Sequence, residues 1–275
     1  MANVTVQDIN KLRQLTGVGM MDCKKALVEC DGDFDKAIDY LREKGKKLAA
    51  KRADRSANEG CVLAECDSSN TFAAVIMINC ETDFVAQNEG FVSFTKSVLD
   101  QAIKAKAKTI DEVNKLSING TTVETLLVDQ VAKIGEKITF SQYSAIEAPA
   151  TYAYTHPGNR MASVVGLNKT NFDKVGKEMA MQVVSMRPIS VDKSSVPQDI
   201  IEKEMEVYRI QIKEEGKPEN MIEKIAEGKL NKFFKESTLL PQEFILEAKT
   251  TVEQYLKQQD KDLTVTSFAR AELGA

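Results

Sequence analysis

The sequence predicts an α+β protein: a small helical bundle, then two related units that each combine an antiparallel sheet with a helix. Three observations lead to this prediction. The first 45 residues carry apolar side chains at helical spacing, separated by glycine-containing breaks. Two segments with the order strand–strand–helix then follow, at residues 61–106 and 150–186. A helical hairpin at about 197–235 is inserted in the second unit.

The length of the chain fits this organisation. It has 275 residues, 43% of them hydrophobic, enough to form the cores of one large or two to three smaller domains. We therefore expect a three-helix domain and linker at residues 1–55. The first subdomain is expected at 56–148, and the second, which contains the hairpin, at 149–275.

Three short helices are expected between residues 4 and 45. Thr5, followed three residues later by Asp8, resembles a capping box at the start of the first helix. The glycines of residues 16–19 (TGVG) end it, and residues 31–33 (DGD) form the next turn. The apolar positions that this pattern supplies are Ile9, Leu12, Leu15, Cys23, Ala26, Leu27, Cys30, Phe34, Ala37, Ile38 and Leu41.

Residues 44–55 (KGKKLAAKRADR) are basic and rich in alanine. A solvated helical linker is the favoured interpretation, because the run is short and lacks the aromatic side chains on which bases stack. A contact with nucleic acid is the alternative, and it predicts RNA binding that weakens steeply with salt.

The first α+β unit begins with strands at 61–66 and 71–80, joined by a turn at 67–70. The second strand, FAAVIMINC, is apolar without alternation, which predicts a central strand. The elements expected after it are a helix at 84–106, short helices around an Asn119–Gly120 turn within 109–134, and a strand at 137–148.

The second unit repeats this order. Strands are expected at 150–155 and 160–167, with a turn at 156–159 and a helix at 171–186. Pro197 suits the first position of the next helix, and residues 216–218 (GKP) break the hairpin. Residues 263–272 are expected to form a closing strand.

Composition argues against several classes of function. With 37 basic and 41 acidic residues the net charge is −4, and there is no Trp, so no direct nucleic-acid partner is expected. Five cysteines without Cys-x-x-Cys spacing indicate reduced thiols in a cytoplasmic protein, and no metal site. Residues 1–11 lack a signal-peptide pattern, and no apolar run approaches the ~20 residues that a membrane span needs.

Covalent catalysis is not expected either. The single histidine, His156, lies beside Pro157–Gly158 in a turn, and the chain has no G-x-S-x-G or Walker A motif. Gly17-x-Gly19 lacks the third glycine of a dinucleotide fingerprint. We therefore expect no enzyme and no cofactor.

Two segments resemble the signatures of the elongation factor Ts family: residues 12–27 (LRQLTGVGMMDCKKAL) and 79–91 (NCETDFVAQNEGF). Residues 131–136, 216–218 and 223–233 match it too, so the resemblance covers nearly the whole chain in order. It implies a ubiquitin-associated-like fold for the N-terminal bundle. The chain stops at Ala275, whereas some members carry a further C-terminal module that contacts the partner.

The resemblance implies a guanine-nucleotide exchange factor that binds elongation factor Tu, a GTPase holding GDP through Mg²⁺ and a phosphate loop. Asp83 and Phe84 would be inserted beside that Mg²⁺ and displace it, with Thr82 and Val85 completing the segment. GDP then leaves and GTP can rebind, without covalent chemistry.

Docking residues are implied as well. Met20 and Met21 are implied to contact the partner's nucleotide-binding domain. The alternative is that one of the two faces the small core, and both can hold, one for each. Ile134–Gly135 is placed near the start of a strand. The full set implied to bind the partner is Met20, Met21, Asp22, Lys24, Lys25, Ile134, Gly135 and His156.

The residues taken alone leave alternatives open. Without the resemblance, Thr82 or Asp83 is interpreted as a helix N-cap and Phe84 as a residue packed in the core. Residues 1–45 alone would suit a ubiquitin-associated-type adaptor without exchange activity. The apolar residues of the hairpin would serve homodimerisation or packing within the chain.

Overall fold

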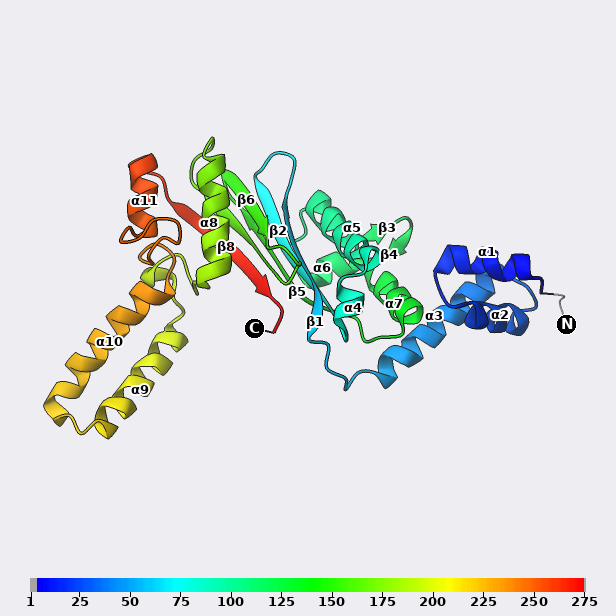
Figure 1. Cartoon of the computed structure of the whole chain (residues 1–275), viewed down its shortest axis with the longest axis horizontal. Coiled ribbons are helices and arrows are strands. Elements are labelled where there is room, and N and C mark those ends of the chain that lie inside the picture. The colour runs from blue at the N-terminus through cyan, green and yellow to red at the C-terminus, as the bar shows by residue number, and fades with distance from the viewer. Residues whose placement is uncertain (1–3, 275) are drawn as a thin grey trace.

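The computed structural model describes residues 4–274. Residues 1–3 and 275, at the outer limits of the first and last expected domains, lie outside this range. Figure 1 shows an elongated molecule with the N-terminal helices at one end, the hairpin α9–α10 at the other, and the sheets between them. The α+β fold class is confirmed. The bounds of the expected domains stay a prediction.

The N-terminal bundle consists of α1 (Val6–Thr16), α2 (Met20–Glu29) and α3 (Phe34–Lys51). The capping box is confirmed: the Asp8 amide donates to Thr5 Oγ1 at 3.2 Å, and the Thr5 amide donates to Asp8 Oδ2 at 3.0 Å. Gly17 ends α1 with φ of 70°. Of the apolar positions expected in α1, Leu15 does not reach the core: it is 63% exposed, because only Ile9 and Leu12 of α1 face the bundle.

Helix α3 runs six residues beyond position 45, so most of the basic segment 44–55 is helical. Its interpretation as a solvated linker holds for one face only. Gly45 packs against the neighbouring helix α7 (Val123–Ile134), where a Cβ atom would lie 3.0 Å from Ala132 Cβ. The ion pair between Arg42 and Asp129, with Nε and Oδ1 3.3 Å apart, joins the same two helices.

The first sheet has the antiparallel order β1 (Glu59–Cys66), β2 (Phe72–Cys80) and β5 (Thr139–Glu147). The prediction of a central strand is confirmed for β2, which is buried on both faces. Helix α5 (Glu89–Ala105) covers one face, where its Phe91 and Val98 pack against Ile76. The other face meets the second sheet.

The single helix expected at 84–106 was wrong. It is divided into α4 (Asp83–Ala86) and α5, because Asn88 caps α5 by accepting the Gly90 amide at 2.9 Å. The region 109–134 also differs from expectation. Between α6 (Ile110–Lys115) and α7, the Asn119–Gly120 turn joins two short strands, β3 (Ser117–Ile118) and β4 (Thr121–Thr122).

The second sheet has the order β6 (Ala150–Thr155), β7 (Met161–Leu167) and β8 (Val265–Glu272), the last being the expected closing strand. Helix α8 (Asp173–Met186) covers its outer face. The inner faces of the two sheets pack together through the apolar side chains of Val62, Val75, Ala162 and Ala271, joined by Leu273 just after β8. The result is four layers, helix–sheet–sheet–helix (Figure 1).

The inserted hairpin consists of α9 (Gln198–Glu214) and α10 (Ile222–Ser237), linked through the short 3₁₀ turn η2 (Glu219–Met221). Pro197 is the N-cap of α9 and not its first helical residue. The sequence analysis missed η1 (Lys193–Ser195) and α11 (Val252–Gln259). Among residues 4–274, none of the helices combines the length and apolarity that crossing a bilayer requires.

The apolar side chains of the hairpin are divided between its inside and its surface. Ile212, Ile222 and Ala226 are buried between the two helices. Val207 and Ile210 are exposed. Packing within the chain therefore accounts for one set, and homodimerisation through the other stays a prediction.

Candidate functional site

Phe84 lies on the one-turn helix α4 directly after the central strand β2, and its side chain is 84% exposed. The alternative of core packing is thus wrong for Phe84. Thr82 is the N-cap, because its Oγ1 accepts the Val85 amide at 3.4 Å. Asp83 is the first helical residue, and its Oδ1 accepts the Phe84 amide at 3.0 Å. An exposed phenyl ring at the end of a buried strand is unusual for a residue type that is normally inside.

The support beneath Phe84 is buried. Ala86 belongs to the core of the first sheet, and Val85 packs against it. Helix α4 therefore has two different sides. Asp83 and Phe84 are exposed to solvent, whereas Val85 and Ala86 pack the turn against the core of the first sheet.

Two carboxylates that the sequence analysis missed hold the segment before α4. Glu136 accepts the backbone amides of Glu81 and Thr82 at 3.0 and 3.1 Å and the Thr82 hydroxyl at 2.7 Å. Glu81 accepts the Lys137 amide at 2.6 Å and a guanidinium hydrogen bond from Arg52 at 2.5 Å. The earlier signals were only positional: Glu81 lies within the family-like segment 79–91, and Glu136 is at the end of the segment 131–136.

The pKa of the Glu81 carboxyl is lowered to about 2. The hydrogen bond from the Lys137 amide contributes most, and hydrogen bonds from Arg52 and Arg55 add to it against the opposing effect of burial. Glu81 is therefore a carboxylate at neutral pH, and it ties residues 52–55 to the base of α4.

A groove runs from Phe84 to the N-terminal bundle. One cavity of about 280 Å³ is lined by Gly17, Phe84, Val85, Asn88, Phe91, Gln130, Lys133 and Ile134. A second, of about 440 Å³, is lined by Val18, Gly19, Asp22, Leu41, Lys44, Gly45, Leu48, Ala132, Lys133, Ile134 and Gly135. The two share Lys133 and Ile134, so they meet at the C-terminal end of α7.

The TGVG loop between α1 and α2 forms one wall of this groove. Gly17 has φ of 70°, and a Cβ atom there would lie 2.9 Å from Lys133 Cδ. A side chain at position 17 would be strained by its backbone and would displace Lys133. The groove thus brings Asp22, Phe84, Val85, Ile134 and Gly135 of the implied set together.

The remaining residues at the bundle lie on its outer surface. Met20 and Met21 are 43% and 76% exposed, so the alternative in which one of them faces the core was wrong. Cys23 takes that core position instead. Lys24 and Lys25 are exposed on α2.

Ile134 and Gly135 lie at the end of a helix, a few residues before β5 begins at Thr139, in keeping with their expected place near the start of a strand. Gly135 is the C-cap of α7, with φ of 82°. Only after the turn that contains Glu136 does the chain enter β5.

His156 lies outside the groove, exposed in the turn between β6 and β7. Its Nδ1 is 3.0 Å from the Tyr154 hydroxyl. The same turn packs on β1, because the Val62 amide donates to the Asn159 carbonyl at 2.8 Å and Arg160 pairs with Glu59. Since Glu59 lies opposite Cys80 in the sheet, this turn is at the same end of the sheet as Asp83.

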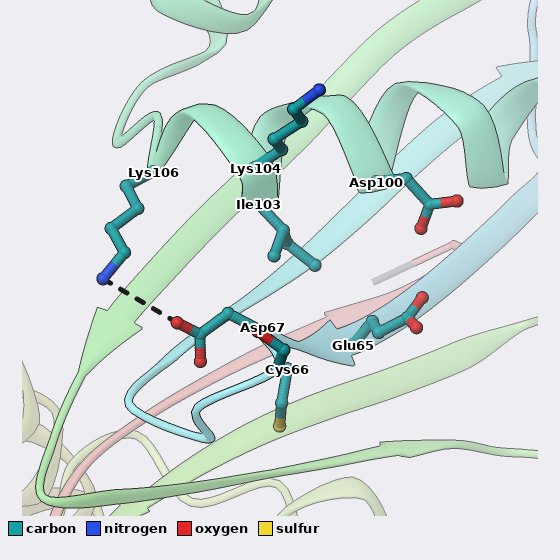
Figure 2. A pocket seen from close by; sticks show the side chains of 8 residues that line it. Glu65, Cys66, Asp67, Asp100, Ile103, Lys104 and Lys106 are labelled. Carbon is teal, nitrogen blue, oxygen red and sulfur yellow. Dashed lines mark ion pairs between the residues drawn. The ribbon is translucent and has the colours of Figure 1, made fainter.

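The cavity of Figure 2, about 390 Å³, lies at the other end of β1 and β2. Nine residues of β2 separate it from α4 by roughly 25–30 Å. Its carboxylates are paired with lysines: Lys106 with Asp67, and Lys96 with both Glu65 and Asp100. Within residues 4–274, no group of three or more His, Cys, Asp or Glu side chains could hold a metal ion.

Comparison with known proteins identifies the family. The family model described as Elongation factor TS matches residues 81–275. The chain is 44% identical to "Elongation factor Ts" of Christiangramia forsetii over the full length of both chains. It is 46% identical to that of Amoebophilus asiaticus and 42% to that of Porphyromonas gingivalis, in each case over 99% of both chains. These matches span the N-terminal bundle, both sheets and the hairpin, and the chain therefore belongs to the elongation factor Ts family.

Proposed function

We propose that this translation elongation factor binds elongation factor Tu in its GDP-bound form and promotes release of GDP by inserting Asp83 and Phe84 beside the bound Mg²⁺. Membership of the elongation factor Ts family supports the class of function. The observation that carries the residue assignment is the 84% exposure of Phe84 on a turn whose other side is buried in the core.

The two side chains would act in different ways. Phe84 is a rigid wedge, and because protein interiors are close-packed, its insertion moves the elements that it separates. Asp83 adds a negative charge and hydrogen-bond acceptors that compete with the ligands and waters around Mg²⁺. When the ion leaves, the phosphates of GDP lose their main neutralising charge, and GDP dissociates.

Exchange requires no covalent step. The factor binds nucleotide-free elongation factor Tu more tightly than the nucleotide-bound form, so it weakens GDP binding. By linkage, incoming GTP weakens the binding of the factor by the same ratio as the factor weakens the binding of GTP. This reciprocity lets one molecule act repeatedly.

Docking would involve the surface around the groove. Met20 and Met21 offer flexible apolar side chains, and Asp22, Lys24 and Lys25 offer charges on the same helix. Ile134 and Gly135 continue this surface toward Phe84. His156 would add a contact from the second sheet, beside Arg160.

An adaptor or RNA-binding function is less well supported. An adaptor function that rests on residues 1–45 alone leaves the exposed Phe84 without a role. The basic segment has several of its cations paired within the chain, including Lys44 with Asp22 and Arg52 with Glu81. Such pairing reduces the charge that is free to contact phosphates.

The test is the release of labelled GDP from elongation factor Tu, stimulated by the wild type and by Asp83→Ala and Phe84→Ala variants. Both variants are expected to lower the maximal stimulated rate, Phe84→Ala more strongly. Leu246→Ala is the matched control, since Leu246 is another exposed apolar side chain, outside the groove. Unchanged stimulation by Phe84→Ala would reject the insertion mechanism.

A further inference from the structure

We propose that Glu136 is a positioning residue for exchange: its carboxylate holds Thr82 so that α4 presents Phe84 in one fixed direction. This inference rests on the proposed function, in which Phe84 is the inserted group. It concerns a side chain that does not itself project from the surface toward the partner, because its oxygens are engaged with residues 81 and 82.

Helix α4 needs external support. It has four residues, a single turn, and a turn of that length is not stable by itself because nucleation costs more than one hydrogen bond returns. Phe84 contributes little to its stability, since the ring is exposed. The direction of the ring is therefore set by whatever fixes the two ends of the turn.

The N-terminal end is fixed through Thr82. Its hydroxyl has one proton and two lone pairs. The proton is donated to Glu136 Oε1 at 2.7 Å, which leaves the lone pairs free to accept the Val85 amide at 3.4 Å. Glu136 thus orients the hydroxyl that caps α4.

The second oxygen of Glu136 fixes the backbone. Oε2 accepts both the Glu81 and the Thr82 amides, at 3.0 and 3.1 Å, so neither peptide can rotate without losing a hydrogen bond to a charged group. On the other side of the same turn, the Cys80 thiol donates to the Thr82 carbonyl at 3.2 Å.

The contact is reciprocal. Glu136 accepts backbone amides from residues 81 and 82, while Glu81 accepts the backbone amide of Lys137, the residue after Glu136. Lys137 Nζ in turn donates to the carbonyls of Ala53 and Arg55, at 2.6 and 2.9 Å. Three segments that are distant in sequence are therefore joined at the base of α4.

This arrangement predicts a defined kinetic effect. Loss of the Glu136 carboxylate would leave docking on the groove unchanged. It would lower the fraction of bound complexes in which Phe84 enters productively. Misplacement of a reacting or inserted group by about 1 Å is enough to cost a large factor in rate. The maximal rate should fall, and the half-saturating concentration of the factor should stay nearly constant.

The experiment is a double-mutant cycle on stimulated GDP release, using wild type, Glu136→Ala, Phe84→Ala and the double variant. Glu136→Ala alone is expected to lower the maximal rate about tenfold, the effect of losing a set of charge-assisted hydrogen bonds. In the Phe84→Ala background it should cause no further loss, because there is no ring left to position. Glu124→Ala is the matched control, as it removes the same charge from an exposed site on α7.

Two further measurements separate positioning from general destabilisation. Hydrogen exchange at the Val85, Ala86 and Gln87 amides should become faster in Glu136→Ala, while amides of β2 keep their protection. Glu136→Gln retains one acceptor oxygen and should recover part of the rate. If Glu136→Ala does not fold, as judged by circular dichroism, the same cycle with Glu136→Gln decides the question.

The outcomes are distinguishable. A wild-type rate for folded Glu136→Ala beside an impaired Phe84→Ala overturns this inference alone. Equal fold losses from the Glu136 substitution in both backgrounds also overturn it. A wild-type rate for Phe84→Ala overturns the proposed function, and the inference with it.

Discussion

Gly45 of α3 lies against Ala132 of α7, and this contact joins the N-terminal bundle to the first sheet. A Cβ atom at Gly45 would lie 3.0 Å from both Ala132 Cβ and the Val128 carbonyl oxygen. Because the groove between Asp22 and Ile134 runs beside this contact, the separation of α3 and α7 sets its width.

A matched pair of glycine substitutions tests this contact. Gly228→Ala, on α10 with open space around it, is expected to stabilise the protein by about 0.5–1 kcal/mol through its helix propensity. Gly45→Ala should lose that gain, because the methyl group pushes α3 away from α7. Urea denaturation measures both. An equal gain for the two variants would contradict the close approach.

Gly45→Ala should also weaken stimulated GDP release through affinity. The wider groove raises the half-saturating concentration of the factor, whereas the maximal rate, which we propose depends on Phe84, is retained. This pattern is opposite to that expected for Glu136→Ala, so one titration compares the two.

Gly176 of α8 lies beneath the ring of Tyr152, and a Cβ atom there would be 2.1 Å from Tyr152 Cδ2. Gly176→Ala is expected to destabilise the second sheet by about 1–3 kcal/mol, because the ring has to leave its position in the core. The denaturation midpoint gives the loss. A Tyr152→Leu change in the same chain should recover part of it.

The acid dependence of stability should depend on Glu81. Its folded-state pKa of about 2 lies below the ordinary value of 4.5, so its contribution is complete above pH 4.5 and is lost as the pH falls toward 2. The stability difference between wild type and Glu81→Gln should therefore be largest near pH 6–7 and shrink between about pH 5 and 2. Urea denaturation at a series of pH values measures it. A difference that is constant with pH would show that the charge is not responsible.

The cysteines should differ in the rate at which their thiols react. Burial raises the pKa of Cys61 to about 11 and that of Cys80 to about 12, so both remain protonated thiols at pH 8. Cys30 and Cys66 are partly exposed and should be alkylated first. Mass spectrometry after brief treatment with iodoacetamide identifies the order. Early labelling of Cys80 would indicate that the turn before α4 opens.

Much of the fold followed from local patterns in the sequence. The Thr5–Asp8 capping box, the turn at 67–70 and the apolar strand β2 depend on side chains within a few residues of each other, so their signals survive in the linear sequence. The break before α5 was missed although its cause, the Asn88 cap, is also local. The helical spacing of apolar residues continues across Asn88, so this pattern does not reveal the cap.

Other features depended on contacts between distant segments. The burial of Ile9 and Leu12 but not Leu15 is decided by where α2 and α3 lie. Ile134 and Gly135 were expected near the start of a strand, but only the tertiary structure shows that Ile134 lines the same cavity as Phe84.

At the candidate site, what the sequence determined can be separated from what the tertiary structure decided. The residue types of Thr82, Asp83, Phe84 and Val85, and their position after an apolar strand, were determined by the sequence itself. The exposure of Phe84 and the hydrogen bonds from residues 81 and 82 to Glu136 were decided by tertiary structure. A carboxylate 54 residues away can accept the Thr82 hydroxyl only after β2 and the turn after α7 have been brought together, and no local sequence pattern predicts that contact.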